Sequence, residues 1–151
     1  MKQLSVVSFQ LSVDRNDFMR DFEGRRWRAV GFGLATVALG LGIRFVHVGL
    51  PWVVVKYGGS MLWAVMIFWI FSALMPQWPL VRIALLSGTV ATGVEFFKLY
   101  HSPGMDAFRL ALAGKVLLGR VFSGWDIAAY WGAIAAGMAL EAGIRRARSR
   151  A

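Results

Sequence analysis

Four long apolar stretches set the pattern of hydrophobic and polar positions along this chain. They run over Ala29–Leu50, Tyr57–Met75, Val81–Phe97 and Ile127–Leu140, and the charged residues gather in a few places within and between them. A hydrocarbon layer about 30 Å thick needs about 20 helical residues at a rise of about 1.5 Å each. The pattern therefore predicts an all-α membrane protein, built as a bundle of four transmembrane helices.

The polar segments divide the chain into three parts. We expect an N-terminal arm over residues 1–28, the transmembrane domain over residues 29–141 and a basic tail over residues 142–151. Between the third and fourth stretches, the chain is too polar for a fifth span and too apolar for a free loop. The run Ala107–Leu118 predicts a short interfacial or re-entrant helix there, which at membrane depth must be buried in protein or line a wet cavity.

Small residues recur at four-residue spacing in the third and fourth stretches and predict close helix packing. The rows are Ala84–Gly88–Thr92 and Ser87–Ala91–Glu95 in the third stretch, and Ala128–Gly132–Ala136 and Ala129–Ala133–Gly137 in the fourth. We expect these two helices to form a close pair, with the glycine-rich first stretch as third partner. The second stretch, rich in aromatic residues, is expected to offer more of its surface to lipid.

Composition and charge narrow the function classes. The chain is 58% hydrophobic and contains no cysteine, which excludes disulfides, thiolate nucleophiles and cysteine-ligated metal centres. Its net charge of +9 is compatible with nucleic-acid binding, but the basic residues lie beside the apolar stretches. Membrane topology explains that placement better, so no nucleic-acid partner is expected.

The basic residues are unequally divided between the two predicted sides of the bundle. Eleven fall on the side of the termini, and six at or near the other side. The eleven are Lys2, Arg15, Arg20, Arg25, Arg26, Arg28, Arg82, Arg145, Arg146, Arg148 and Arg150, and the six are Arg44, Lys56, Lys98, Arg109, Lys115 and Arg120. By the positive-inside rule, both termini are predicted to be cytoplasmic.

Several motifs together resemble a known family. They are KYGGSMLW from Lys56 to Trp63, EFFKLYHSPGMDAFR from Glu95 to Arg109, LGRVF from Leu118 to Phe122 and WDIAAY from Trp125 to Tyr130. This pattern is similar to an uncharacterised bacterial family of small polytopic membrane proteins, the domain of unknown function 2809 type. That family is itself similar to the VanZ-like proteins, named for glycopeptide-antibiotic resistance. Many relatives carry an aspartate where this chain has Ser60.

The resemblance covers about residues 29–137. It implies where the protein is located and in which process it takes part, but it names no reaction. It implies a multi-pass protein of the bacterial cytoplasmic (inner) membrane with a role in the cell envelope.

A candidate site follows from the charges that the predicted topology brings to the extracytoplasmic side. The seven residues are Arg44, Glu95, His101, Asp106, Arg109, Arg120 and Asp126. Each ionisable group costs about 2.5–3.5 kcal/mol at membrane depth, so these groups should pair with one another or with a ligand. The three arginines would contact an anion through paired guanidinium donors, and the three carboxylates would orient them.

Structural roles compete with this interpretation. Glu95 can form an ion pair with Arg44 or Arg109 that only locks the bundle, and its row with Ser87 and Ala91 predicts that it points inward. Three further pairs have local explanations: a capping box between Ser123 and Asp126, and helical ion pairs Asp106–Arg109 and Glu141–Arg145.

Catalytic and metal chemistry find little support in the residue pattern. His47 and His101 are too isolated to form a metal site by spacing, and no activated nucleophile accompanies the carboxylates. We expect no catalytic residue, no metal and no cofactor.

Two function hypotheses from different classes follow. The first is a membrane protein that binds an amphiphilic or lipid-linked anionic group at the charged cluster, with membrane lipids as partners. The alternative is a structural or assembly subunit, working as a homo-oligomer or with a partner membrane subunit. A proton-coupled transporter is a third possibility that would need oligomerisation, because four spans barely enclose a pathway.

Overall fold

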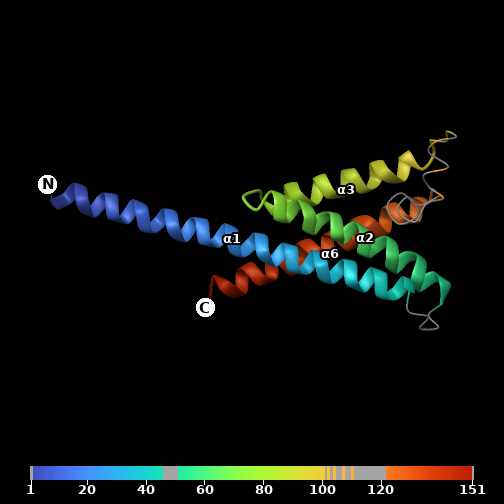
Figure 1. Ribbon diagram of the computed structural model, residues 1–151, viewed down its shortest axis with the longest axis horizontal. Helices are drawn as coiled ribbons and strands as arrows, with labels where there is room; N and C mark the ends of the chain where they lie inside the picture. Colours follow the sequence, from blue (N-terminus) through green and yellow to red (C-terminus); the bar gives the residue numbers. More distant parts are fainter. Residues whose placement is uncertain are drawn as a thin grey trace.

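The computed structural model describes residues 2–45, 51–100, 102, 104, 107, 110 and 122–150. This part of the chain contains the helices α1 (Lys2–Phe45), α2 (Trp52–Leu74), α3 (Leu80–Phe97) and α6 (Gly124–Arg148), and no strand. The predicted all-α class is confirmed. Figure 1 shows that the N-terminal half of α1 extends beyond the other helices, and that both chain ends lie on the same side of the bundle.

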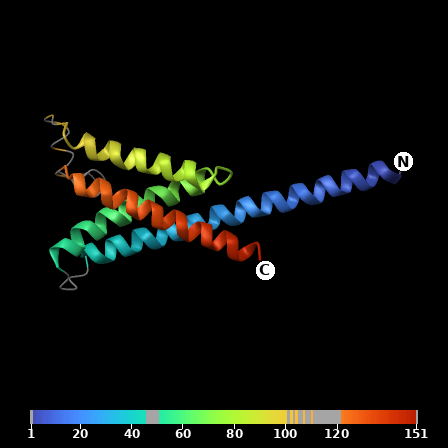
Figure 2. The ribbon, with the colours of Figure 1, turned by 180° about the vertical axis from the view of Figure 1, so that it is seen from behind.

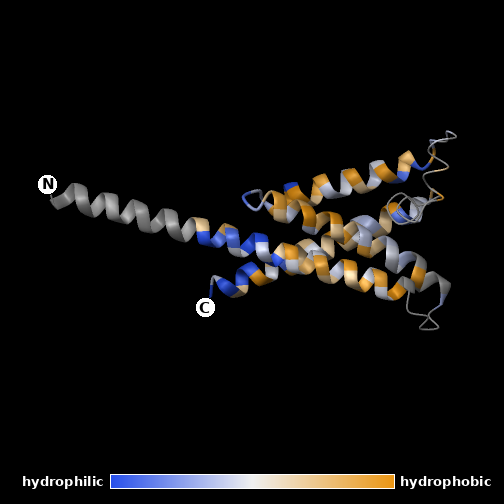
Figure 3. Ribbon diagram, viewed as in Figure 1, coloured by the Kyte–Doolittle hydropathy of each residue, from blue (hydrophilic) through white to orange (hydrophobic). Residues whose placement is uncertain are grey.

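Three of the described helices are long and apolar enough to cross a membrane: Tyr57–Leu74, Leu80–Phe97 and Gly124–Arg148. The expected first span, Ala29–Leu50, does not qualify. Its apolar part forms only the second half of α1, it includes Arg44, and residues 46–50 lie outside the described residues. Figure 3 shows the change along α1 from hydrophilic residues to hydrophobic ones. The expected short helix over Ala107–Leu118 lies mostly outside the described residues and stays a prediction.

The helix α2 lies at the centre of the bundle. It packs against α1, α3 and α6, whereas the backbone of α1 comes close to α2 alone among the described helices. Figure 2 gives the same arrangement from behind. The side chains of Phe68 and Trp69 are buried, so these two aromatic residues pack inside the bundle. The expectation that the second stretch offers more of its surface to lipid stays a prediction. Large aromatic side chains fill the space that small residues leave: Phe68 packs on Gly137, and Trp69 stacks on Phe32.

The helices α3 and α6 pack together, as the small-residue rows predicted. The ring of Trp131 lies so close to Gly88 that a Cβ there would be 2.5 Å from it. The indole N–H of Trp131 also donates to the Thr92 hydroxyl at 3.3 Å. The expected third partner, α1, does not join this pair by backbone packing, because it lies on α2.

A tight turn connects α2 to α3 between two prolines, Pro76 and Pro79. Its backbone is closed by a hydrogen bond from the Trp78 N–H to the Met75 carbonyl at 3.0 Å. Pro79 immediately precedes α3 with φ −65° and ψ 143°, the extended conformation suited to a residue before a helix. This turn places the beginning of α3 beside the end of α2.

Candidate functional site

Glu95 lies in the last turn of α3 and is fully buried. Ser87 and Ala91, two and one turns earlier, are also fully buried, so the row points into the bundle as predicted. A carboxylate in such surroundings must be hydrogen-bonded or paired, because an isolated buried charge is unstable. The partners of Glu95 therefore define the site.

Both carboxylate oxygens of Glu95 have partners. Oε2 accepts hydrogen bonds from the ammonium group of Lys98 and, at 2.7 Å, from the hydroxyl of Tyr130. Oε1 accepts from the backbone N–H of Ser123 at 2.7 Å. Bonds to an ionised acceptor are about twice as strong as neutral ones, so this set holds α3 firmly to the start of α6.

Tyr130 extends the contacts to the third helix. The side chain of Ser60 on α2 interacts with the tyrosine hydroxyl, and the tyrosine itself donates to Glu95. Trp63 packs beside the phenol ring, with 5.6 Å between ring centroids. We call the residues Ser60, Glu95, Lys98, Ser123 and Tyr130 the Glu95 network. This network links α2, α3 and α6 at one end of the bundle.

The beginning of α6 differs from the predicted capping box. Ser123 is the residue before the helix, with extended backbone, but its side chain makes no capping hydrogen bond. In a capping box, the third helical residue reaches back to the N–H of the cap. Here that N–H donates to Glu95 of another helix. Asp126 is buried in the first turn, where a carboxylate also interacts favourably with the helix dipole.

Only part of the predicted site lies within the described residues. Glu95 and Asp126 are buried at the same end of the bundle, and Arg44 lies in the last turn of α1, although its side chain is outside the description. His101, Asp106, Arg109 and Arg120 lie outside the described residues, so their contacts stay predictions.

Lys98, Tyr130 and Ser60 belong to the network, but the sequence interpretation did not select them. The spacing of Lys98, three residues after Glu95, was a signal that could have found it. Tyr130 and Ser60 carry no comparable local signal, because Tyr130 reaches Glu95 from another helix and Ser60 contacts Tyr130 from a third.

The described network is a closed set of donors and acceptors. Lysine, tyrosine and one backbone N–H donate to a single carboxylate, and Ser60 joins the network through the tyrosine, so the arrangement fixes three helices relative to one another. Among the described residues, no three histidine, aspartate or glutamate side chains gather in a way that could hold a metal ion.

A comparison with family models assigns part of the chain to a family. The model of a family described as a protein of unknown function, DUF2809, matches residues 49–134. This range is more than half of the chain and contains α2, α3, the first part of α6 and every residue of the Glu95 network. No solved structure matches the chain.

Proposed function

The chain belongs to the DUF2809 family, and we propose that it is a membrane protein that binds the anionic group of an amphiphilic or lipid-linked molecule in an envelope-related role. The proposed place is the end of the bundle that carries the Glu95 network. Three helices long and apolar enough to span a membrane agree with an integral membrane protein.

One observation carries this proposal: a buried carboxylate–lysine pair at the end of a membrane bundle holds both borders of the segment 99–121. Glu95 bonds Lys98 just before that segment and Ser123 just after it. Ionisable groups buried among membrane helices are costly and usually serve a function. Within the segment, Arg109 and Arg120 would contact the anion, and Glu95 is the positioning residue.

The other candidate residues have supporting roles in this proposal. Arg44, in the last turn of α1, would add a third guanidinium, because α1 ends on the side where α2 begins. Asp106 and Asp126 would orient the arginines, and His101 would offer a further hydrogen bond.

We also propose that α1 crosses the membrane as the fourth helix. Arg28 of α1 contacts Glu141 near the end of α6, and α1 then continues to Phe45 alongside α2. At about 1.5 Å per residue, that part is about 26 Å long, close to the hydrocarbon thickness of about 30 Å. With four crossings of a bacterial inner membrane, both termini would be cytoplasmic.

The test compares two changes of equal charge within the segment 99–121. We expect Arg109→Gln to keep wild-type abundance in the membrane and to reproduce the phenotype of the gene deletion, such as sensitivity to glycopeptides or detergents. Lys115→Gln removes one positive charge from the same segment and should preserve both abundance and phenotype. A variant Arg109→Gln that is abundant and indistinguishable from wild type would overturn the proposal.

A second candidate function, a subunit that packs against a partner helix, is favoured by one surface. Ala128, Gly132 and Ala136 form an exposed row on α6, while Ala133 and Gly137 face the bundle. Rows of small residues allow close backbone approach between membrane helices. A second copy or another protein retained stoichiometrically by the wild type, and lost in Gly132→Leu, would favour this function. Gly93→Leu, an exposed glycine on α3, is the control.

A further inference from the structure

A second charged cluster lies at the opposite end of the bundle from the Glu95 network. Glu141 of α6 is buried, and its Oε1 accepts from Arg145 at 2.9 Å and from Arg28 of α1 at 3.1 Å. The pair Glu141–Arg145 was predicted and is confirmed, but the contact from α1 was not expected. Arg25, one turn before Arg28, donates to the carbonyl of Trp78 at 3.3 Å. We call Arg25, Arg28 and Arg145 the arginine cluster.

The arginine cluster holds more donors than the protein satisfies. Nε and Nη1 of Arg28, Nε of Arg25 and Oε2 of Glu141 are buried and have no hydrogen-bond partner within the described residues, so three donors stand against one acceptor. Three guanidinium groups surround one buried carboxylate, and the other nearby acid, Asp21, is exposed. Burial lowers the pKa of Arg25, and the neighbouring charge of Arg145 lowers it further. The excess of positive charge around Glu141 therefore favours the binding of an added anion.

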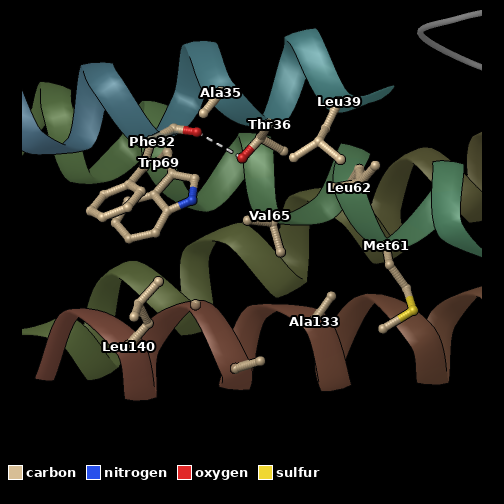
Figure 4. Close-up of a pocket in the computed structure, with 12 residues that line it drawn as sticks. Phe32, Ala35, Thr36, Leu39, Met61, Leu62, Val65, Trp69, Ala133 and Leu140 are labelled. Atoms are coloured by element: carbon tan, nitrogen blue, oxygen red, sulfur yellow. Dashed lines mark hydrogen bonds between the residues drawn. The ribbon is translucent and has the colours of Figure 1, made fainter. Parts of the chain in front are cut away.

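An apolar groove of about 400 Å³ lies between α1 and α6, with α2 as its floor. Figure 4 shows Phe32 and Leu39 of α1 on one side, Leu140 of α6 on the other and Val65 of α2 between them. The one hydroxyl among the lining side chains, on Thr36, donates to the Phe32 carbonyl at 2.7 Å. The groove thus offers an apolar lining, and its volume lies in the range of about 300–1,000 Å³ typical of small-molecule sites.

The groove leads to the arginine cluster. On α1, Phe32 follows Arg28 by one helical turn, and on α6, Gly137 precedes Glu141 by one turn. Residues one turn apart share a helix face, so the same two faces carry the groove and then the charges. From Arg28 to Leu39, α1 rises about 16 Å, which is about half of a 30 Å hydrocarbon layer.

We propose that the groove and the arginine cluster together bind one anionic phospholipid of the surrounding membrane, with its phosphate on Arg25 and Arg28 and an acyl chain along the groove. Charge complementarity at the arginines favours an anionic headgroup, and the apolar lining of the groove favours an acyl chain. A free phosphate ion would leave the groove unused, and a zwitterionic lipid would add no net negative charge at the arginines. The length of one leaflet matches the distance from the cluster to Leu39.

The first test measures lipid selection directly. The full chain is reconstituted with equal amounts of phosphatidylglycerol and phosphatidylcholine of identical acyl chains, and retained lipids are counted by native mass spectrometry. We expect phosphatidylglycerol to be enriched and Arg28→Gln to reduce the enrichment about fivefold, the usual effect of one arginine near anionic lipid. Arg146→Gln is the matched control, because Arg146 is an exposed arginine in the last turn of α6, next to Arg145 of the cluster. Equal retention of both lipids by the wild type, or an equal loss in the control, would refute the site.

The second test asks whether the groove holds the acyl chain of the lipid. Ala136 and Ala135 are adjacent exposed alanines of α6, and only Ala136 lines the groove. We expect Ala136→Phe to reduce the retained phosphatidylglycerol severalfold and Ala135→Phe to leave it unchanged. Equal retention by these two variants, or full competition by inorganic phosphate, would overturn the lipid as occupant.

A third variant separates binding from folding. If the arginines exist only to neutralise Glu141, Glu141→Gln lowers both thermal stability and lipid retention. If they bind lipid, Glu141→Gln frees two guanidinium groups and raises the enrichment of phosphatidylglycerol, which is the result we expect. Tyr130→Phe, in the Glu95 network, should leave the enrichment unchanged. This site and the function proposed for the opposite end can therefore fail separately.

Discussion

At the scale of single residues, burial decides what Glu95 does. A carboxylate with no exposed surface needs a complete set of donors, and it obtains them from Lys98, Tyr130 and the N–H of Ser123. Removing one partner of a buried ion pair leaves the other charge uncompensated, whereas removing both can be nearly neutral. Replacing Lys98 alone should therefore affect stability more than replacing Glu95 and Lys98 together.

We therefore predict that Lys98→Met lowers the free energy of unfolding by about 3–5 kcal/mol, because it strands the Glu95 charge. The double change Glu95→Gln with Lys98→Met should recover most of this loss. Arg82→Met, which removes an exposed cation from α3, should change stability by no more than about 0.5 kcal/mol. Thermal unfolding in detergent measures all three. A double variant no more stable than Lys98→Met alone would contradict the charged pair.

At the scale of helices, glycine positions decide how closely two elements approach. The ring of Trp131 occupies the space where a side chain at Gly88 would begin, and this contact joins α3 to α6. Gly93, on the same helix, is exposed and has no neighbouring atom within 4 Å of an added Cβ. A side chain would therefore clash at Gly88 but find free space at Gly93.

Gly88→Ala should lower stability by about 1–3 kcal/mol, because the Trp131 ring must move and lose its hydrogen bond to Thr92. Gly93→Ala should be neutral or more stable by up to about 1 kcal/mol, since alanine is the better helix former. The midpoint of thermal unfolding in the same detergent compares them. Equal midpoints for the two variants would show that the ring adapts without cost.

At the scale of the whole molecule, the two ends of the bundle have different polar networks. The Glu95 network joins α2, α3 and α6 at one end, and the arginine cluster joins α1 to α6 at the other. Between them, α2 fills the centre with aromatic side chains. Both chain ends lie on the side of the arginine cluster (Figures 1 and 2).

The arrangement predicts where topology reporters will be found. Fusions at the N-terminus and at Ser149 should report the cytoplasm, and a reporter inserted at Ser102 should report the opposite compartment. This result requires α1 to cross the membrane, because the crossings of α2, α3 and α6 alone would place the N-terminus with Ser102. An N-terminal signal that matches the Ser102 signal would place α1 outside the bilayer.

The sequence alone determined the features that depend on local geometry. The long apolar stretches predicted helices at the positions of α2, α3 and α6. The row from Ser87 to Glu95 predicted an inward carboxylate, and a spacing of four residues predicted the pair Glu141–Arg145. These features follow from backbone periodicity and need no knowledge of neighbouring helices.

Only the tertiary structure decided which elements meet. The central place of α2, the bond from Glu95 to Tyr130, and the contact of Arg28 with Glu141 join residues far apart in the chain. Many pairings satisfy the same apolar pattern, and the one adopted depends on how large aromatic side chains of α2 fit against small residues of its neighbours. Such complementarity is a property of three helices together, so no single stretch of sequence carries it.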